Sequence, residues 1–155
     1  MKKWICIALL TVMALAGFAC AGTAETAAEA GSTLEDVLAG FELGEEMMTL
    51  TEEDLSDIYG IEAEDMVQFA AAVNSTGIKA DEIVLVEAVD DAAAARVKEA
   101  LDNRFQSKLN ELDGYLPEEY AVTQACSVEM EGCFVSMIVA PNAADLVKLY
   151  NESIQ

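Results

Sequence analysis

The chain contains no histidine, and only eight of its 155 residues are lysine or arginine. Without histidine, the Ser–His and Cys–His pairs that activate many nucleophiles cannot form in their usual arrangement. The 29 acidic residues give a formal net charge of −21, which repels nucleic-acid phosphates and anionic membrane surfaces. These acids are spread along the chain, and no segment has the spacing of an EF-hand loop. We therefore expect no nucleic-acid partner, no metal site, no cofactor and no catalytic set: the chain is predicted not to be an enzyme.

The N-terminus resembles the export signal of a bacterial lipoprotein, and we assign residues 1–19 to this signal. Lys2 and Lys3 precede Trp4–Ala19, a run of 16 residues without charge. A membrane-spanning helix needs about 20 apolar residues, so this run is better suited to the core of a signal peptide. Cys20 follows at the position where lipoproteins receive a diacylglycerol. We expect lipid on Cys20 to anchor the mature chain to the extracytoplasmic face of the cell membrane.

Two alternatives stay open, because Gly17 and Phe18 match the usual lipoprotein pattern poorly. Ala19-Cys20-Ala21 has the A-x-A form of an ordinary cleavage site, and cutting after it would release a soluble secreted protein. A signal that is not cleaved would instead act as a helical membrane anchor.

A flexible tether and one domain are predicted to follow the signal. Residues 20–32 are mostly small and polar, with no large apolar side chain, so they cannot bury enough surface to become ordered. As a coil, such a segment spans roughly 20 Å. Residues 33–155 have a common domain size and are predicted to form a single core.

The first half of this domain is predicted to hold two short helices and a β-hairpin. The spacing of apolar residues predicts helices over Thr33–Phe41 and over residues 51–60. Met66–Val73 and Glu82–Val89 are predicted to be antiparallel strands, with a polar turn between them.

The strongest helical pattern covers Asp90–Leu112. Its apolar residues recur at intervals of three or four, which predicts one buried stripe. They are Val97, Leu101, Phe105, Leu109 and Leu112. The same helix carries four basic residues, Arg96, Lys98, Arg104 and Lys108. Pairing with nearby acids is the favoured interpretation of this cluster, and a docking face is the alternative.

The second half is predicted to repeat the hairpin. Pro117 suits the first turn of a short helix, and Val122–Met130 and Cys133–Ala140 are predicted strands around a turn at Glu131-Gly132. Asn142 is predicted to cap a C-terminal helix. The resulting fold class is α+β: a four-stranded antiparallel sheet from two hairpins, with the long helix between them and the C-terminal helix packed on one face.

Cys126 and Cys133 are the cysteines of the predicted domain, and an extracytoplasmic compartment permits disulfides. With the turn at Glu131-Gly132, Cys126 lies four residues from the position that faces Cys133. At about 3.3 Å per residue, this offset exceeds the roughly 7 Å that a disulfide can bridge. Two core thiols are favoured, with a disulfide through a different turn and a reactive thiol as alternatives.

Arg104, Tyr115 and Tyr120 are the candidate binding residues. Arg104 falls one position off the apolar stripe, so we expect it at the boundary between helix and sheet. There, pairing with a carboxylate is favoured over a role in ligand binding. A ligand held between the sheet and the long helix would contact Arg104 and the two tyrosines.

Five segments of the chain resemble the bacterial domain of unknown function 4358, which is found mainly in small lipoproteins of Gram-positive-type bacteria. These segments are Tyr59-Gly60-Ile61, Ala80-Asp81-Glu82-Ile83, Asn103-Arg104-Phe105-Gln106, Tyr115-Leu116-Pro117-Glu118-Glu119-Tyr120 and Gly132-Cys133-Phe134-Val135. Their order and spacing extend the resemblance over about residues 52–140. The resemblance implies a lipoprotein context and no established activity.

These features together predict a non-enzymatic module that is held at the membrane through lipid on Cys20 and docks to another protein of the cell envelope. A lipoprotein that binds a small molecule or an ion is the alternative class. An apolar hollow lined by Arg104 and the two tyrosines would favour ligand binding, whereas an exposed apolar patch would favour docking.

Overall fold

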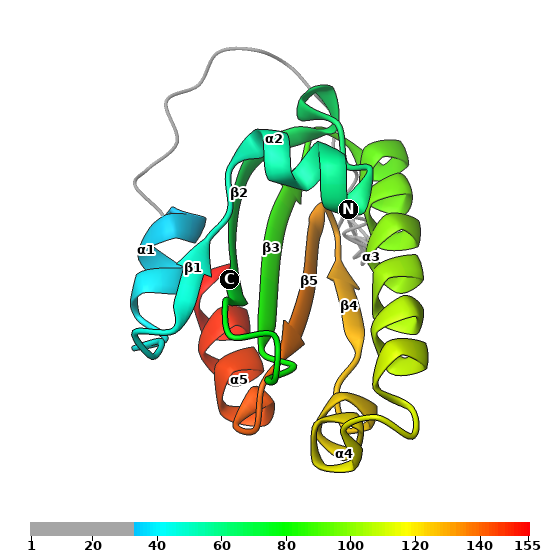
Figure 1. Cartoon of the computed structure of the whole chain (residues 1–155). Helices are drawn as coiled ribbons and strands as arrows, with labels where there is room; N and C mark the ends of the chain where they lie inside the picture. The colour runs from blue at the N-terminus through cyan, green and yellow to red at the C-terminus, as the bar shows by residue number, and fades with distance from the viewer. Residues whose placement is uncertain (1–32) are drawn as a thin grey trace, which may run out of the picture.

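The computed structural model describes residues 33–155, and within them a five-stranded antiparallel sheet forms the centre of the fold (Figure 1). The strand order is β1-β2-β3-β5-β4. The strands are β1 (Met47–Thr49), β2 (Met66–Asn74), β3 (Glu82–Ala88), β4 (Val128–Glu131) and β5 (Phe134–Val139). The predicted signal 1–19, the lipidation site Cys20 and the tether 20–32 lie outside the described residues.

Helices cover both faces of this sheet (Figure 1). The long helix α3 lies on one face, and α1 and α5 lie on the other. The helices are α1 (Leu34–Ala39), α2 (Glu52–Asp54), the π-helical turn η1 (Leu55–Tyr59), the 3-10 turn η2 (Ala63–Asp65), α3 (Asp91–Leu112), α4 (Pro117–Gln124) and α5 (Ala143–Ser153). Among the described residues, no helix is both long enough and apolar enough to cross a membrane.

The central strand β3 contributes to two separate cores. Val84 and Val86 pack with α3, in a core that includes Leu101. Ile83 and Leu85 point the other way, into a core formed with α1 and α5. Successive side chains of a strand point to opposite faces, so a run that is apolar on both faces indicates a strand buried on both sides.

Several sequence-based expectations are confirmed. Met66–Val73 and Glu82–Val89 form the antiparallel pair β2–β3, and the predicted long helix is α3. The Asp90 side chain caps α3 by accepting a hydrogen bond from the Ala93 N–H at 2.7 Å. Pro117 occupies the first turn of α4, where its missing N–H costs no hydrogen bond.

The expected α+β class with an antiparallel sheet is confirmed, but the expected arrangement of four strands with helices on one face is wrong in three respects. The short segment Met47–Thr49 adds a fifth strand, β1, which pairs with β2. The C-terminal helix α5 packs on the face opposite α3, because apolar side chains such as Ile138 need cover there too. The predicted strand Val122–Met130 is helical up to Gln124, and only Val128–Met130 belongs to β4.

The second hairpin also differs in register from the expectation. Glu131 pairs with Phe134, so the turn consists of Gly132 and Cys133, and Gly132 has the positive φ of 58° that this turn requires.

Cys126 precedes β4 and is a half-buried free cysteine, so no disulfide joins it to Cys133. Burial raises the pKa of the Cys126 thiol, which disfavours the reactive thiolate.

Candidate functional site

The most concentrated polar chemistry of the described residues lies between β3 and α3, around Glu82. Glu82 is the first residue of β3, and its side chain is fully buried. The alternation of β3 places it on the same face as Val84 and Val86, directly under α3. A carboxylate in such a position must be paired, because burying an unpaired charge is very costly.

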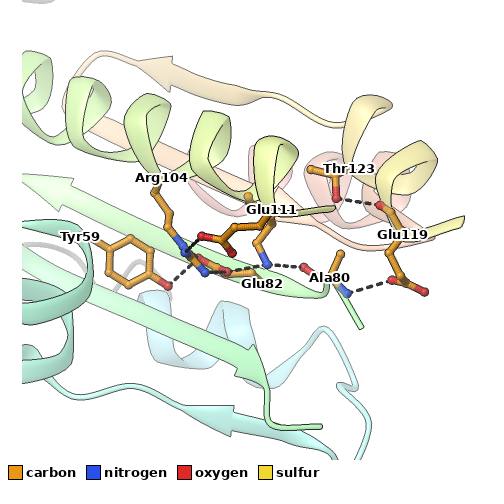
Figure 2. Close-up of polar contacts among 8 residues, drawn as sticks. Tyr59, Ala80, Glu82, Arg104, Glu111, Glu119 and Thr123 are labelled. Carbon is orange, nitrogen blue, oxygen red and sulfur yellow. Dashed lines mark hydrogen bonds and ion pairs between the residues drawn. The ribbon is translucent and has the colours of Figure 1, made fainter. Parts of the chain in front are cut away.

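Three side chains donate hydrogen bonds to the Glu82 carboxylate (Figure 2). Arg104 uses Nε at 2.9 Å and Nη2 at 2.8 Å, and the two atoms contact different carboxylate oxygens. The Lys108 Nζ lies 2.8 Å from Oε2, and the Tyr59 hydroxyl donates to Oε1 at 2.8 Å. Arg104 and Lys108 are four residues apart in α3, so they lie on the same face of the helix.

The local structure of η1 brings Tyr59 to Glu82. The helix begins at α2, where Thr51 and Asp54 form a reciprocal capping box. It widens to a π-helical turn over Leu55–Tyr59 and ends at Gly60, whose φ of 70° lies in the left-handed region. The Tyr59 ring is buried, and its hydroxyl is directed at the carboxylate (Figure 2).

The pKa of the Glu82 carboxyl group lies below its ordinary value. Burial alone raises this pKa, but the hydrogen bonds from Arg104 and the positive charges of Lys108 and Arg104 outweigh burial. Burial and the negative charge of Glu82 raise the pKa of Tyr59, so its hydroxyl stays protonated as a donor. The network is therefore an ionised carboxylate held by two cations and a neutral phenol, an arrangement suited to holding structure rather than to proton transfer.

A second buried carboxylate, Glu119 of α4, lies beside this network. Its Oε1 accepts a hydrogen bond from Lys79 Nζ at 2.7 Å, and its Oε2 accepts one from the Ala80 N–H at 2.9 Å. The Ala80 carbonyl accepts a hydrogen bond from Lys108 Nζ at 3.0 Å. Ala80 is thus held from both sides, and the segment before β3 is tied to α3 and to α4 at once (Figure 2).

The three predicted binding residues do not form one site. Arg104 pairs with a carboxylate at the helix–sheet boundary, and its Nη1 also lies 3.8 Å from Glu111. Tyr115 is 71% exposed, in the turn after α3. Tyr120 is half-buried in α4, where its hydroxyl accepts a hydrogen bond from Gln124. No hydrogen bond of the described residues joins either tyrosine to Arg104.

Sequence reasoning did not assign Tyr59, Glu82 and Glu119 to a site, and it expected Lys108 only to pair with nearby acids. A signal was present for Lys108, which lies four residues after Arg104 on α3. Glu82 gave a weaker signal, an acid directly before a continuous apolar run. Across residues 33–155, no group of three or more acidic or cysteine side chains is placed to hold a metal ion.

Two surface hollows lie away from this network, beside α1. One has a volume of about 550 Å³ and lies over β2, between α1 and β1. The other has a volume of about 490 Å³ and lies between the loop that joins α1 to β1 and the start of α5. The segment Glu42–Met47 contributes to the walls of both, and Arg104, Tyr115 and Tyr120 contribute to neither.

Acid is expected to destabilise the domain through Glu82 and Glu119. The pKa of Glu119 is also lowered, because the donors Lys79 and Ala80 outweigh the effect of burial. Both folded pKa values lie below the ordinary 4.5, so the stability they contribute is complete above that value and is lost as the pH falls through the folded values. Asp81 acts in the opposite sense, because burial raises its pKa.

The measurement is urea unfolding between about pH 7 and about pH 3. The Glu119→Gln variant is the control, because it lacks one of the two titrating groups and should lose less stability over the same interval. An equal loss in this variant and the unaltered chain would contradict the assignment to Glu119.

Comparison with known proteins gives one match. The model of the family described as "Domain of unknown function (DUF4358)" matches residues 41–140. No curated protein and no solved structure matches the chain. The matched region begins in the loop after α1 and ends just after β5, so it contains the whole sheet and the Glu82 network. Because the match covers more than half of its length, this chain belongs to the DUF4358 family.

Proposed function

We propose that this protein is a lipid-anchored, non-enzymatic module of the cell envelope, which docks to another envelope protein. The observation that carries the proposal is the N-terminal pattern of two lysines, an uncharged apolar run and Cys20. Two acyl chains on Cys20 would anchor the chain firmly, since each buried methylene contributes about 0.8 kcal/mol. The tether 20–32 would hold the domain a short distance from the membrane.

The chemistry of the domain supports a role in binding rather than in catalysis. The buried Glu82 carboxylate is neutralised by Arg104 and Lys108, and all three side chains have hydrogen-bond partners within the protein. An active site would instead present a reactive group to a cleft. The hollow beside α1 keeps a small-molecule ligand as the second candidate function.

The anchor is tested by replacing Cys20. The Cys20→Ala chain is expected to lose incorporation of radiolabelled palmitate and to move from the membrane fraction to the medium or to remain as unprocessed precursor. The measurement is palmitate labelling followed by fractionation of intact cells. If processing and membrane binding are unchanged in Cys20→Ala, Cys20 is not lipidated. If the unaltered protein is cleaved, soluble and free of label, it is secreted in the ordinary way.

Docking is tested by crosslinking in intact cells with a tag on the C-terminus, followed by identification of the copurified proteins. One reproducible envelope partner is the expected result. If no partner is found at saturating crosslinker, the docking function fails. The ligand alternative is then examined through the melting temperature of the purified protein with a panel of ligands, because a ligand of the native state raises it.

A further inference from the structure

We infer that the groove between α1 and β1 is the docking surface, and that it receives a basic amphipathic segment of another envelope protein. This inference rests on the proposed docking function and assigns it a place and a partner chemistry. The groove is formed by the end of α1, the strand β1 and the part of β2 that lies between them. It lies on the face of the sheet opposite the Glu82 network.

The groove is hollow because its floor consists of small side chains. Ala70 and Ala72 of β2 form this floor, and Leu38 of α1 and Met47 of β1 contribute to the walls. The volume of about 550 Å³ falls within the roughly 300–1,000 Å³ that binding pockets span. Its lining is mostly apolar, so a few apolar side chains of a partner would be buried there.

The rim of the groove is acidic and has no basic counterpart. Glu35 and Glu42 are exposed at its edge, and Glu42, Glu45 and Glu46 also line the neighbouring hollow. The sequence contains no lysine or arginine from residue 4 to residue 78. Within residues 33–155, no ion pair involves any of these four acids.

The uncompensated charge selects among possible occupants. A second copy of this chain would bring the same acidic rims together and is repelled by a net charge of −21 on each molecule. Anionic lipid is repelled for the same reason. A segment that combines apolar side chains with lysine or arginine matches both the floor and the rim, as in amphipathic helices that bind apolar grooves.

Two neighbouring residues of β1 provide a matched pair of variants. Thr49 pairs with Ala72, lines the groove and is exposed, so a tryptophan there would fill the groove. Met48 pairs with Val73 and points to the other face, where it is 54% exposed. Thr49→Trp and Met48→Trp thus add the same side chain to the same edge strand on opposite faces.

The first measurement is fluorescence anisotropy with the full chain in phosphatidylcholine nanodiscs, a zwitterionic membrane, with empty discs as the background. The probe is a fluorescent amphipathic peptide of leucine and lysine, and its counterpart is the same pattern of leucine and glutamate. Thr49→Trp is expected to weaken binding of the lysine peptide about tenfold or more, and Met48→Trp by less than about twofold. Equal effects of the two variants, or equal binding of the two peptides, would overturn the assignment.

A second pair of variants separates the rim from general attraction to an acidic protein. Glu35→Gln with Glu42→Gln is expected to weaken binding about three- to tenfold and to reduce its salt dependence. Glu99→Gln with Glu118→Gln removes two exposed charges elsewhere and should change binding by less than about twofold. If both pairs weaken binding equally, the attraction is not specific to the groove and the inference fails.

Crosslinking in cells then distinguishes this inference from the proposed function. A partner that crosslinks to the unaltered chain and to Met48→Trp, but not to Thr49→Trp, supports both. A partner that crosslinks equally to Thr49→Trp supports docking and overturns the assignment to the groove. If the unaltered chain yields no partner, the docking function itself fails.

Discussion

Replacing Arg104 with methionine is expected to lower the free energy of unfolding by about 3–5 kcal/mol, because it leaves a fully buried carboxylate with one of its two cations. The loss is measured by urea unfolding at neutral pH. Without Arg104, burial raises the pKa of Glu82, so this group becomes protonated at a higher pH than in the unaltered chain. The difference between the two proteins is therefore expected to shrink as the pH falls.

The control for this prediction lies on the same helix. Arg96 pairs with Asp65, but the Arg96 side chain is 58% exposed. Exposed ion pairs contribute about 0–1 kcal/mol, so Arg96→Met should change the free energy of unfolding by no more than that. If Arg104→Met costs as little as Arg96→Met, the Glu82 network does not hold α3 to the sheet.

Replacing Leu85 with alanine is expected to lower the free energy of unfolding by about 2–5 kcal/mol, as is typical of a buried leucine. Leu85 lies in β3 with no exposed surface, in the core formed with α1 and α5. This result depends on the sheet being covered on both faces. In a sheet with helices on only the α3 face, Leu85 would face solvent and the same change would cost little.

Leu149 is the matched control for Leu85→Ala. It lies in α5 and is 45% exposed. Leu149→Ala should change the free energy of unfolding by about 0.5 kcal/mol or less, as for other surface substitutions. Comparable losses in the two variants, in urea unfolding, would contradict the two-faced core.

Elements with a long apolar repeat could be predicted from the sequence, and short ones could not. The α3 stripe extends over several turns, and β3 carries a continuous apolar run, so both left clear patterns. β1 has three residues, fewer than any period needs to become visible. Residues 117–124 contain both helix-forming and β-branched residues, and tertiary packing of α4 decides between the two patterns.

The Glu82 network likewise could be predicted from the sequence only in part. Arg104 could be predicted because its distance from the apolar stripe can be read along one helix. Glu82 left only a weak signal, because its burial depends on α3, whose Arg104 lies 22 residues away. Glu82 follows Asp81 at the start of a strand, and such a pair of acids usually indicates exposure to solvent. Tyr59 was missed because a π-helical turn, which the sequence did not signal, directs its hydroxyl.

The strand order has a consequence for how the chain reaches its folded form. β5, near the C-terminus, lies between β3 and β4 and pairs with both. Its Val139 pairs with Glu82 of β3. Because a chain is synthesised from its N-terminus, the edge of β3 that pairs with β5 has no partner until residues 134–139 have been made. Such late closure of a long loop slows folding. The sheet cannot be completed before then, and an incompletely folded chain is the state in which a polypeptide can be threaded through a narrow channel.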